Sequence, residues 1–482
     1  MEKQHTFFVC IYKSDDGKQI GHAVSQHNDF SENISAEKKS GLRETSQEGS
    51  GFADIFAKFK HSMFAYIDLL PLIASAAPFA TWMLRSQNLI KMLNDECVHK
   101  CEEKNRIVYE LPERLYQNYK ELEETADSLS LIGRQVPKML IIGIVSSYEY
   151  YSSLLIREIY RSNAGMIEGS EKNISIKDVF LSGNLEDFKE IVIDKEIEDV
   201  MRRAFPDQIR WFENALSLKT PIREEYPKWD ELVEIFERRN IFAHANGIVG
   251  KRYLDKLNNL KLPSDKTPER GQELYANGRY FKQSLENITE FGLKLIQVVW
   301  RKLYREEVDI ADNSASDFAF DLIRKGEYKL ASTIYRFLEA NKNIDAELRL
   351  RNIVNLANCY ALLNDEPTRD QVLATHEWAA VSDNYAIAVA AVKGDTAKVI
   401  ALMKKLKHDE EWYETFYEEW PVFFHVREDA DFIEAFEYLY GRTFVPEPRT
   451  KNASKALQLY LGEKPKDLKE EDGPALAGAS LH

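Results

Sequence analysis

The sequence contains few cysteines, no excess of positive charge and no long hydrophobic run at its start. Four cysteines in 482 residues are too few for a disulfide framework, which fits a reducing compartment such as the cytoplasm. Lysine and arginine number 64 against 79 acidic residues, so the net charge is −15 and any RNA-binding surface has to be local. Because the first thirty residues alternate polar and apolar side chains, we expect no secretory signal.

The cysteines also predict no metal site. Cys97, His99 and Cys101 lie close together, but their spacing differs from that of a zinc knuckle and no second Cys/His pair follows. We expect neither a metal nor another cofactor. Because Cys97 and Cys101 are one helical turn apart, we expect both thiols on one face of a helix.

The segment that most resembles a membrane span is residues 63–84. It approaches the required length, but Asp68, Pro71 and Pro78 interrupt it. We expect a broken, buried helical hairpin or an apolar surface that faces a partner, rather than a transmembrane helix. A membrane-associated effector remains an alternative, which flotation with liposomes tests.

The two ends of the chain differ from its middle. Within residues 1–28, the segments TFFVCIY and QIGHAV flank residues 14–18, whose Asp-Gly pair predicts the turn of a β-hairpin. Residues 29–51 are rich in Ser, Glu and Gly and predict a flexible linker. The polar, proline-containing residues 445–482 predict a largely disordered tail.

The middle of the chain is predicted to be mainly helical, in two parts. Residues 52–308 have continuous helical patterning, with residues 163–225 inserted between two core helices and a helix at 280–304 that closes the bundle. A short polar break at 309–316 separates this body from a different pattern over residues 316–444.

Residues 316–444 resemble tetratricopeptide repeats. Degenerate units combine two helices with a turn such as Gly326-Glu327 or Gly394-Asp395. Helix pairs of this kind bury their faces only by stacking, which gives a curved surface suited to a peptide or protein ligand. The aromatic residues near the end of this region predict the core and cap of the array rather than a ligand site: Trp412, Tyr417, Trp420, Phe423, Phe424, Phe432, Phe436 and Tyr440.

The most informative stretch begins with the helix that starts at Trp229. Its apolar residues recur at helical spacing through Phe236, and Arg239 continues the same stripe. An arginine on a buried stripe requires a carboxylate or a ligand anion. His244 follows in the last turn before Asn246-Gly247, near the negative end of the helix dipole, where an imidazole can donate a proton or hold a phosphate.

A second helix, at residues 139–160, supplies the expected carboxylate. Glu149 lies on the same stripe as Ile142, Val145 and Ile156, so it faces the core and is the natural partner of Arg239. The alternative is a buried structural ion pair without chemistry. The two interpretations are compatible, since a paired guanidinium can still face a phosphate.

Arg239, Asn240 and His244, with three residues between the last two, resemble the ribonuclease motif of the HEPN superfamily, and the helix at 139–160 resembles the one that packs on it. The resemblance implies four principal helices, metal-independent RNA cleavage and a homodimer in which two motifs face each other. His244 would transfer protons, Arg239 would bind phosphate and Asn240 would orient the substrate. A second match, Arg369 to His376, lies in the predicted repeats and is set aside.

Basic residues near the motif are candidates for RNA binding, although each could equally belong to a solvated helix face. We expect Lys251 and Arg252 to bind RNA and Arg238 to support the site; Arg202, Arg203 and Arg210 are further candidates.

Two statements about regulation follow from the resemblance. Asn246 stands where a HEPN subgroup paired with a nucleotidyltransferase antitoxin has tyrosine, which argues against that mode of control. A ribonuclease joined to helical repeats resembles bacterial antiphage or abortive-infection effectors, toxins whose repeats hold the nuclease inactive until a protein trigger or inhibitor acts. The alternative is a non-catalytic HEPN and repeat scaffold.

Overall fold

The computed structural model describes residues 8–13, 20–25, 51–82, 89–103, 106–163, 165–166, 184–262, 268–378, 381–409 and 412–446. The chain is mainly helical and divides into two units, Met1–Ser50 and Gly51–His482. In the first unit, strands β1 (Phe8–Lys13) and β2 (Ile20–Ser25) pair antiparallel. The predicted turn at 14–18, the linker up to residue 50 and tail residues 447–482 lie outside the described residues.

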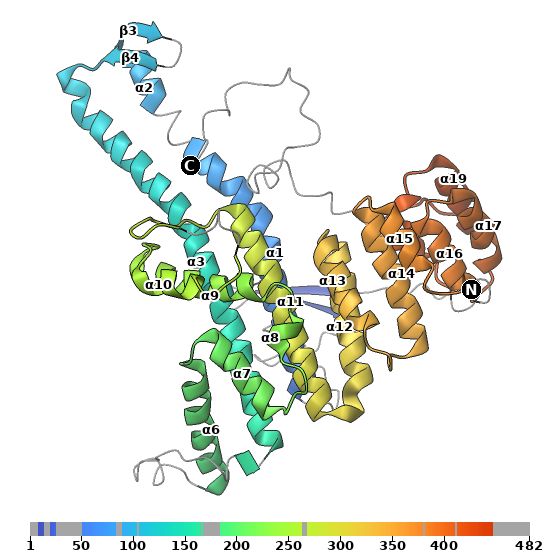
Figure 1. Cartoon of the computed structure of the whole chain (residues 1–482). Coiled ribbons are helices and arrows are strands. Elements are labelled where there is room, and N and C mark those ends of the chain that lie inside the picture. The colour runs from blue at the N-terminus through green and yellow to red at the C-terminus, as the bar shows by residue number, and fades with distance from the viewer. Residues whose placement is uncertain are drawn as a thin grey trace. The chain divides into compact units, whose positions relative to one another are not determined.

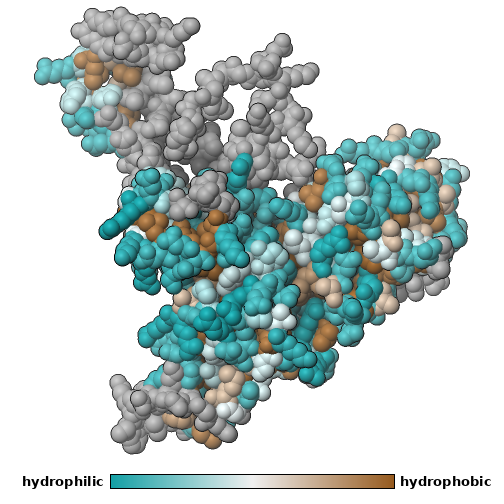
Figure 2. Space-filling model, in the orientation of Figure 1, coloured by the Kyte–Doolittle hydropathy of each residue, from teal (hydrophilic) through white to brown (hydrophobic). Residues whose placement is uncertain are grey.

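Four long helices of the second unit share one core: α1 (Gly51–Trp82), α3 (Tyr116–Ser162), α9 (Trp229–Ala245) and α11 (Gly278–Leu303) (Figure 1). Phe59, Tyr148, Phe236 and Phe291 are buried between them. Hydrophilic side chains dominate the face drawn in Figure 2, where hydrophobic side chains form small separate patches. The apolar stripes expected from the sequence therefore lie mainly inside the helical body.

Helix α1 corrects the prediction of a broken hairpin at residues 63–84. The helix runs without interruption from Gly51 through Pro71 and Pro78 to Trp82. Its N-terminal half buries Phe52, Phe59 and Met63 against α3, α11 and α12. Burial contributes roughly 1.5–3 kcal/mol per large side chain, which across the stripe outweighs about 3 kcal/mol for each interior proline.

Helix α3 contains the one described segment that is long and apolar enough to cross a membrane by length and composition, Gln135–Ser162. Part of this segment is core, because Ile144, Val145 and Ile156 are fully buried against the neighbouring helices. Composition alone is therefore weak support for a membrane span here.

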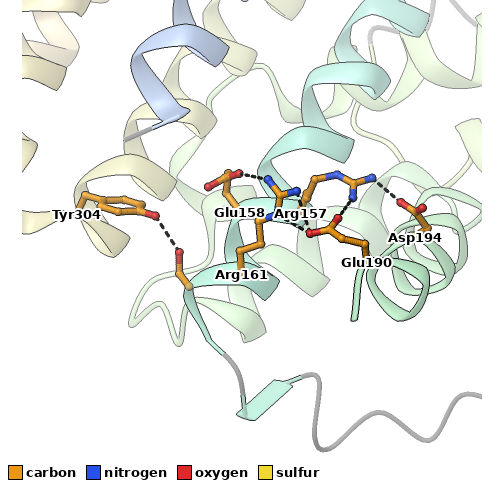
Figure 3. Close-up of polar contacts among 7 residues, drawn as sticks. Arg157, Glu158, Arg161, Glu190, Asp194 and Tyr304 are labelled. Carbon is orange, nitrogen blue, oxygen red and sulfur yellow. Dashed lines mark hydrogen bonds and ion pairs between the residues drawn. The ribbon is translucent and has the colours of Figure 1, made fainter. Parts of the chain in front are cut away.

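The insertion between α3 and α9 forms helices α6 (Leu185–Met201), α7 (Phe205–Ala215) and α8 (Ile222–Glu225). Ion pairs fasten α6 to the end of α3, as Figure 3 shows. Arg157 contacts Glu190 at 2.6 Å and Asp194 at 2.5 Å, and Arg161 contacts Glu190 at 2.9 Å. The start of α7 is thereby held next to α3 and α9.

A second hairpin was not anticipated. After α2 (Leu89–Glu96), strands β3 (Val98–Glu103) and β4 (Arg106–Glu110) pair antiparallel with an irregularity between His99 and Cys101. The expected helix face with two thiols is therefore wrong, since Cys97 precedes the strand and Cys101 lies within it. The run Ile107, Val108, Tyr109 has the β-branched and aromatic character that favours a strand.

The predicted polar break at residues 309–316 is also wrong. These residues form the first half of α12 (Val308–Arg324), in which Ala311, Asp312 and Ala315 are buried. Small side chains let α12 approach α11 closely, and Asp312 forms an ion pair with Arg301 of α11. The polar sequence is thus the contact face of a helix.

The remaining described α-helices follow one another along the chain: α13 (Tyr328–Glu339), α14 (Ala346–Leu362), α15 (Glu366–Leu373), α16 (Asp383–Val392), α17 (Thr396–Leu406), α18 (Thr415–Glu419) and α19 (Ala430–Tyr440). Helices α13, α14 and α15 pack in sequence, α16 packs on α17 and on α14, and α17 packs on α19. Gly326 and Gly394 take positive φ angles, 82° and 71°, at the turns into α13 and α17. Most of the aromatic cluster at the end is buried, as expected, including Tyr417, Phe423 and Phe432.

Candidate active site

The motif helix α9 ends where the sequence predicted. Asn246 adopts the left-handed conformation (φ 49°) and Gly247 follows with φ 90°, so His244 lies in the last turn and is exposed. A Cβ atom at Gly247 would lie 2.7 Å from the carbonyl oxygen of Leu274. Glycine is required at this position for both reasons.

A buried lysine fastens this helix end. The side chain of Lys138, 2% exposed, donates from Nζ to the carbonyl oxygen of Asn246 at 2.9 Å and to Oε1 of Glu273 at 2.8 Å. The same Nζ lies 5.9 Å from the ring centroid of Phe242 and 5.3 Å from that of Tyr275. Lys138 thus ties α3 to the last turn of α9.

Arg239 pairs with Glu149, as the sequence predicted. Nη2 of Arg239 contacts Oε1 of Glu149, and the two side chains are 18% and 25% exposed. Burial raises the pKa of Glu149 above its usual value, and the attraction of Arg239 only partly opposes this shift. Nε of Arg239 is buried and has no hydrogen-bond acceptor among the described residues, so the guanidinium is incompletely satisfied.

Arg239 and its neighbours open onto a cleft of about 510 Å³ between α9, the turn from α6 to α7 and the start of α10 (Lys251–Leu257). Asn240 and His244 line the cleft together with Arg239. The charged side chains of the lining are Arg202, Arg203, Arg239 and Arg252 against Glu149 and Glu237. The lining is therefore rich in arginine for a chain of net charge −15, and two of these arginines, Arg202 and Arg203, also pair with Glu198 and Asp199 of α6 just outside it.

Three of the basic candidates do not line the cleft. Arg238 donates to Glu234 at 2.6 Å and lies over the ring of Tyr280, beside a separate cavity of about 350 Å³. Its supporting role is therefore structural. Lys251 is exposed at the start of α10 outside the cleft, and Arg210 pairs with Asp207 at 2.6 Å.

Other lining residues were missing from the sequence analysis. Phe205 stacks on Phe236 with a centroid distance of 3.9 Å, and Gln208 donates to the carbonyl oxygens of Met201 and Arg203. Pro206 in the first turn of α7 was the available signal, because proline favours a helix start. That signal gives the position of the turn in the sequence but not its contact with α9.

The second motif match is explained by local contacts in the repeats. Arg369 of α15 pairs with Asp370 at 2.9 Å and with Glu366 at 3.7 Å. The ring of His376 packs edge-on against Trp378. Neither side chain lines any of the clefts described here.

No family model, curated protein or solved structure matches this chain. Nor do the described side chains include a group of three or more His, Cys, Asp or Glu residues placed to hold a metal ion.

Proposed function

We propose that the chain is a metal-independent endoribonuclease of the HEPN type. The observation that carries the proposal is the convergence of Arg239, Asn240 and His244 in one arginine-lined cleft of an acidic protein. A phosphodiester backbone is the polyanion that such a cleft attracts. The four-helix core of α1, α3, α9 and α11 supports the HEPN resemblance, and the paired helices α12 to α17 support the comparison with tetratricopeptide repeats.

In this mechanism the 2′-hydroxyl of a ribose attacks the adjacent phosphorus while the bond to the 5′-oxygen breaks. His244 is exposed in the cleft and transfers the proton. Arg239 holds the phosphate through the donors that Glu149 leaves unused, and Asn240 orients it by hydrogen bonding. The products carry a 2′,3′-cyclic phosphate and a 5′-hydroxyl, so no metal-bound water is needed.

A second copy of the chain completes the site in this proposal. His244 is the one histidine that lines the cleft, whereas the reaction requires both a base and an acid. A two-fold axis through the cleft would supply the second imidazole and double the positive charge. Ile248, 43% exposed at the cleft, offers apolar surface for such a contact.

The experiment is cleavage of a labelled single-stranded RNA by purified protein in EDTA, with mapping of the product ends. Arg239→Ala and His244→Ala should each lower the rate by at least about 100-fold, the usual range for a proton-transfer or charge-stabilising group. His376→Ala, which removes a histidine of the repeats, is the matched control and should cleave normally. Intact RNA with folded wild-type protein contradicts the proposal.

A non-catalytic scaffold is the second candidate, and the partly buried Arg239–Glu149 pair favours it. Removing one partner of such a pair destabilises a fold. If Arg239→Ala and His244→Ala both lower the melting temperature and the wild-type protein leaves RNA intact, the pair is structural.

We further propose a toxin-like role in antiviral defence within the cytoplasm, with a protein trigger or inhibitor bound by the helical repeats. The support is the combination of a nuclease-like cleft with an array of paired helices in one chain. Growth arrest on induced expression, absent in His244→Ala, tests this role. Sequencing of the RNA ends in the same cells identifies the target.

A further inference from the structure

A second cleft lies among the C-terminal helices, with a volume of about 690 Å³. Helices α12 and α14 each line it with a row of side chains spaced four residues apart. On α14 the row is Glu347, Arg351 and Asn355, which spans roughly 12 Å along the helix. The cleft is therefore an elongated groove, about as long as four extended residues at roughly 3.3 Å each.

Aromatic rings form much of the remaining wall. Tyr385 of α16 and Phe416 and Trp420 of the α18 region are half-buried, so each ring is partly covered and partly open. Trp420 is held in place because its Nε1 donates to Oδ1 of Asn355 at 3.1 Å. Ring faces in a partly desolvated groove attract cations and cover the apolar stems of long side chains.

The charges in the groove leave two carboxylates without a partner. Glu347 and Glu419 are exposed and form no ion pair within the described part of the chain. The charged residues of the lining are Asp317, Glu347 and Glu419 against Arg324 and Arg351, so carboxylates outnumber cations. Arg351 is already engaged, by Asp317 at 3.5 Å and by Oδ1 of Asn313 at 3.2 Å. The unsatisfied charge at the aromatic wall is therefore negative, which favours a cationic ligand group.

We propose that this groove binds an extended segment of a partner protein through an arginine or lysine side chain. The aromatic wall covers the stem and the cation, and Glu347 and Glu419 pair with the charge. The length of the groove favours a peptide over a free ammonium compound.

Asn384 also lines the groove, and its buried Oδ1 accepts no hydrogen bond among the described residues. After a small movement of this side chain, Oδ1 could accept a hydrogen bond from a peptide N–H. The inference rests on the proposed binding of a protein partner by the helical repeats, but not on ribonuclease activity.

The test is fluorescence anisotropy with full-length protein and a labelled, capped octapeptide that carries two arginines among serines and glycines. Two matched peptides replace the arginines by glutamates or by leucines. The arginine peptide should bind most tightly, and more weakly as salt is raised. Glu347→Gln with Glu419→Gln should weaken its binding about 2- to 30-fold, from about 0.2–1 kcal/mol for each of two exposed pairs.

The matched control is Glu428→Gln with Glu434→Gln. Both glutamates are exposed and lie outside the groove, and this double variant changes the net charge as much as the groove variant does. Its affinity for the arginine peptide should therefore stay at the wild-type value. Phe416→Leu should weaken the arginine peptide more than the leucine peptide. Equal effects of the two double variants, tighter binding of the glutamate or leucine peptide, or no binding of the arginine peptide each overturn the proposal.

Discussion

At the scale of single residues, Glu149 sets both the charge of the candidate active site and the position of Arg239. Burial raises the pKa of Glu149, and the attraction of Arg239 does not fully offset this increase. Glu149→Gln removes a negative charge from the cleft, so an uncleavable 2′-deoxy oligonucleotide should bind about 3- to 10-fold more tightly. Cleavage of RNA should nevertheless slow, because Arg239 loses its fixed partner. Anisotropy and rate measurements on one preparation separate these effects.

The pH dependence has a definite sign. Because the pKa of Glu149 is raised, the carboxylate takes up a proton at a higher pH than an ordinary glutamate, and wild-type affinity should increase as pH falls towards that value. Glu149→Gln lacks this protonation step, and the other residues of the cleft are the same in both proteins. Parallel affinity curves for the two proteins would contradict a role of Glu149 in the charge of the cleft.

Lys138 acts at the same scale, on the helix end that carries His244. Lys138→Met keeps the volume but leaves the carbonyl oxygen of Asn246 and the carboxylate of Glu273 without their buried donor. We expect a loss of about 1–3 kcal/mol in the free energy of unfolding, measured by urea denaturation. Amide exchange should rise in residues 240–248. Lys189→Met, which removes an exposed pair with Glu186, is the control and should change little.

These residues show how far sequence reasoning reaches. The pairing of Arg239 with Glu149 follows from two helical stripes, because each side chain is in phase with a buried face. The contact of Lys138 with Asn246 joins residues 108 positions apart and has no periodic signal. Arg238 lines a different cavity from Arg239 because a shift of one residue turns a side chain by about 100° around the helix.

At the scale of elements, Glu234 joins three helices beside the motif. Its carboxylate accepts hydrogen bonds from Tyr253 of α10 at 2.7 Å and Tyr280 of α11 at 2.9 Å, besides that from Arg238. Tyr280→Phe and Tyr253→Phe should each lower the free energy of unfolding by about 1–2 kcal/mol. Their effects should not add, because the two hydroxyls donate to the two oxygens of one carboxylate, Oε2 and Oε1 of Glu234. Chemical denaturation of both single variants and the double variant measures this coupling. Strict additivity would show that the network does not act as a unit.

Elements also show where patterns mislead. Proline and polar residues predicted breaks at residues 63–84 and 309–316, yet residues 63–82 and 309–316 lie within helices. In each case burial against α11 and its neighbours outweighed the local preference. In β3 and β4 the residues follow their local preference for strand, since their sequence has no apolar stripe at helical spacing. Sequence reasoning therefore located the helical bundle well and the boundaries between its parts poorly.

At the scale of the whole molecule, the core is continuous from Phe52 to Phe444 rather than divided near residue 309. Helix α12 contacts α1 and α11 on one side and α13 and α14 on the other, so it belongs to both parts. Its ion pair between Asp312, 1% exposed, and Arg301 lies at this junction. The two parts should therefore unfold together, although the sequence predicted separate domains.

Arg301→Met tests this cooperativity. Burial raises the pKa of Asp312 and Arg301 opposes this shift. The variant therefore leaves a buried carboxylate whose remaining donor among the described residues is Asn341, at 3.0 Å. At pH 7 we expect a loss of about 3 kcal/mol. A carboxylate with a raised pKa contributes stability that is present at low pH and lost as pH rises, so the deficit should shrink as pH falls. Hydrogen exchange should accelerate equally in α3 and in α16, while Arg336→Met, at an exposed pair with Glu339, changes neither. Faster exchange confined to α11 and α12 would mean that the two parts unfold independently.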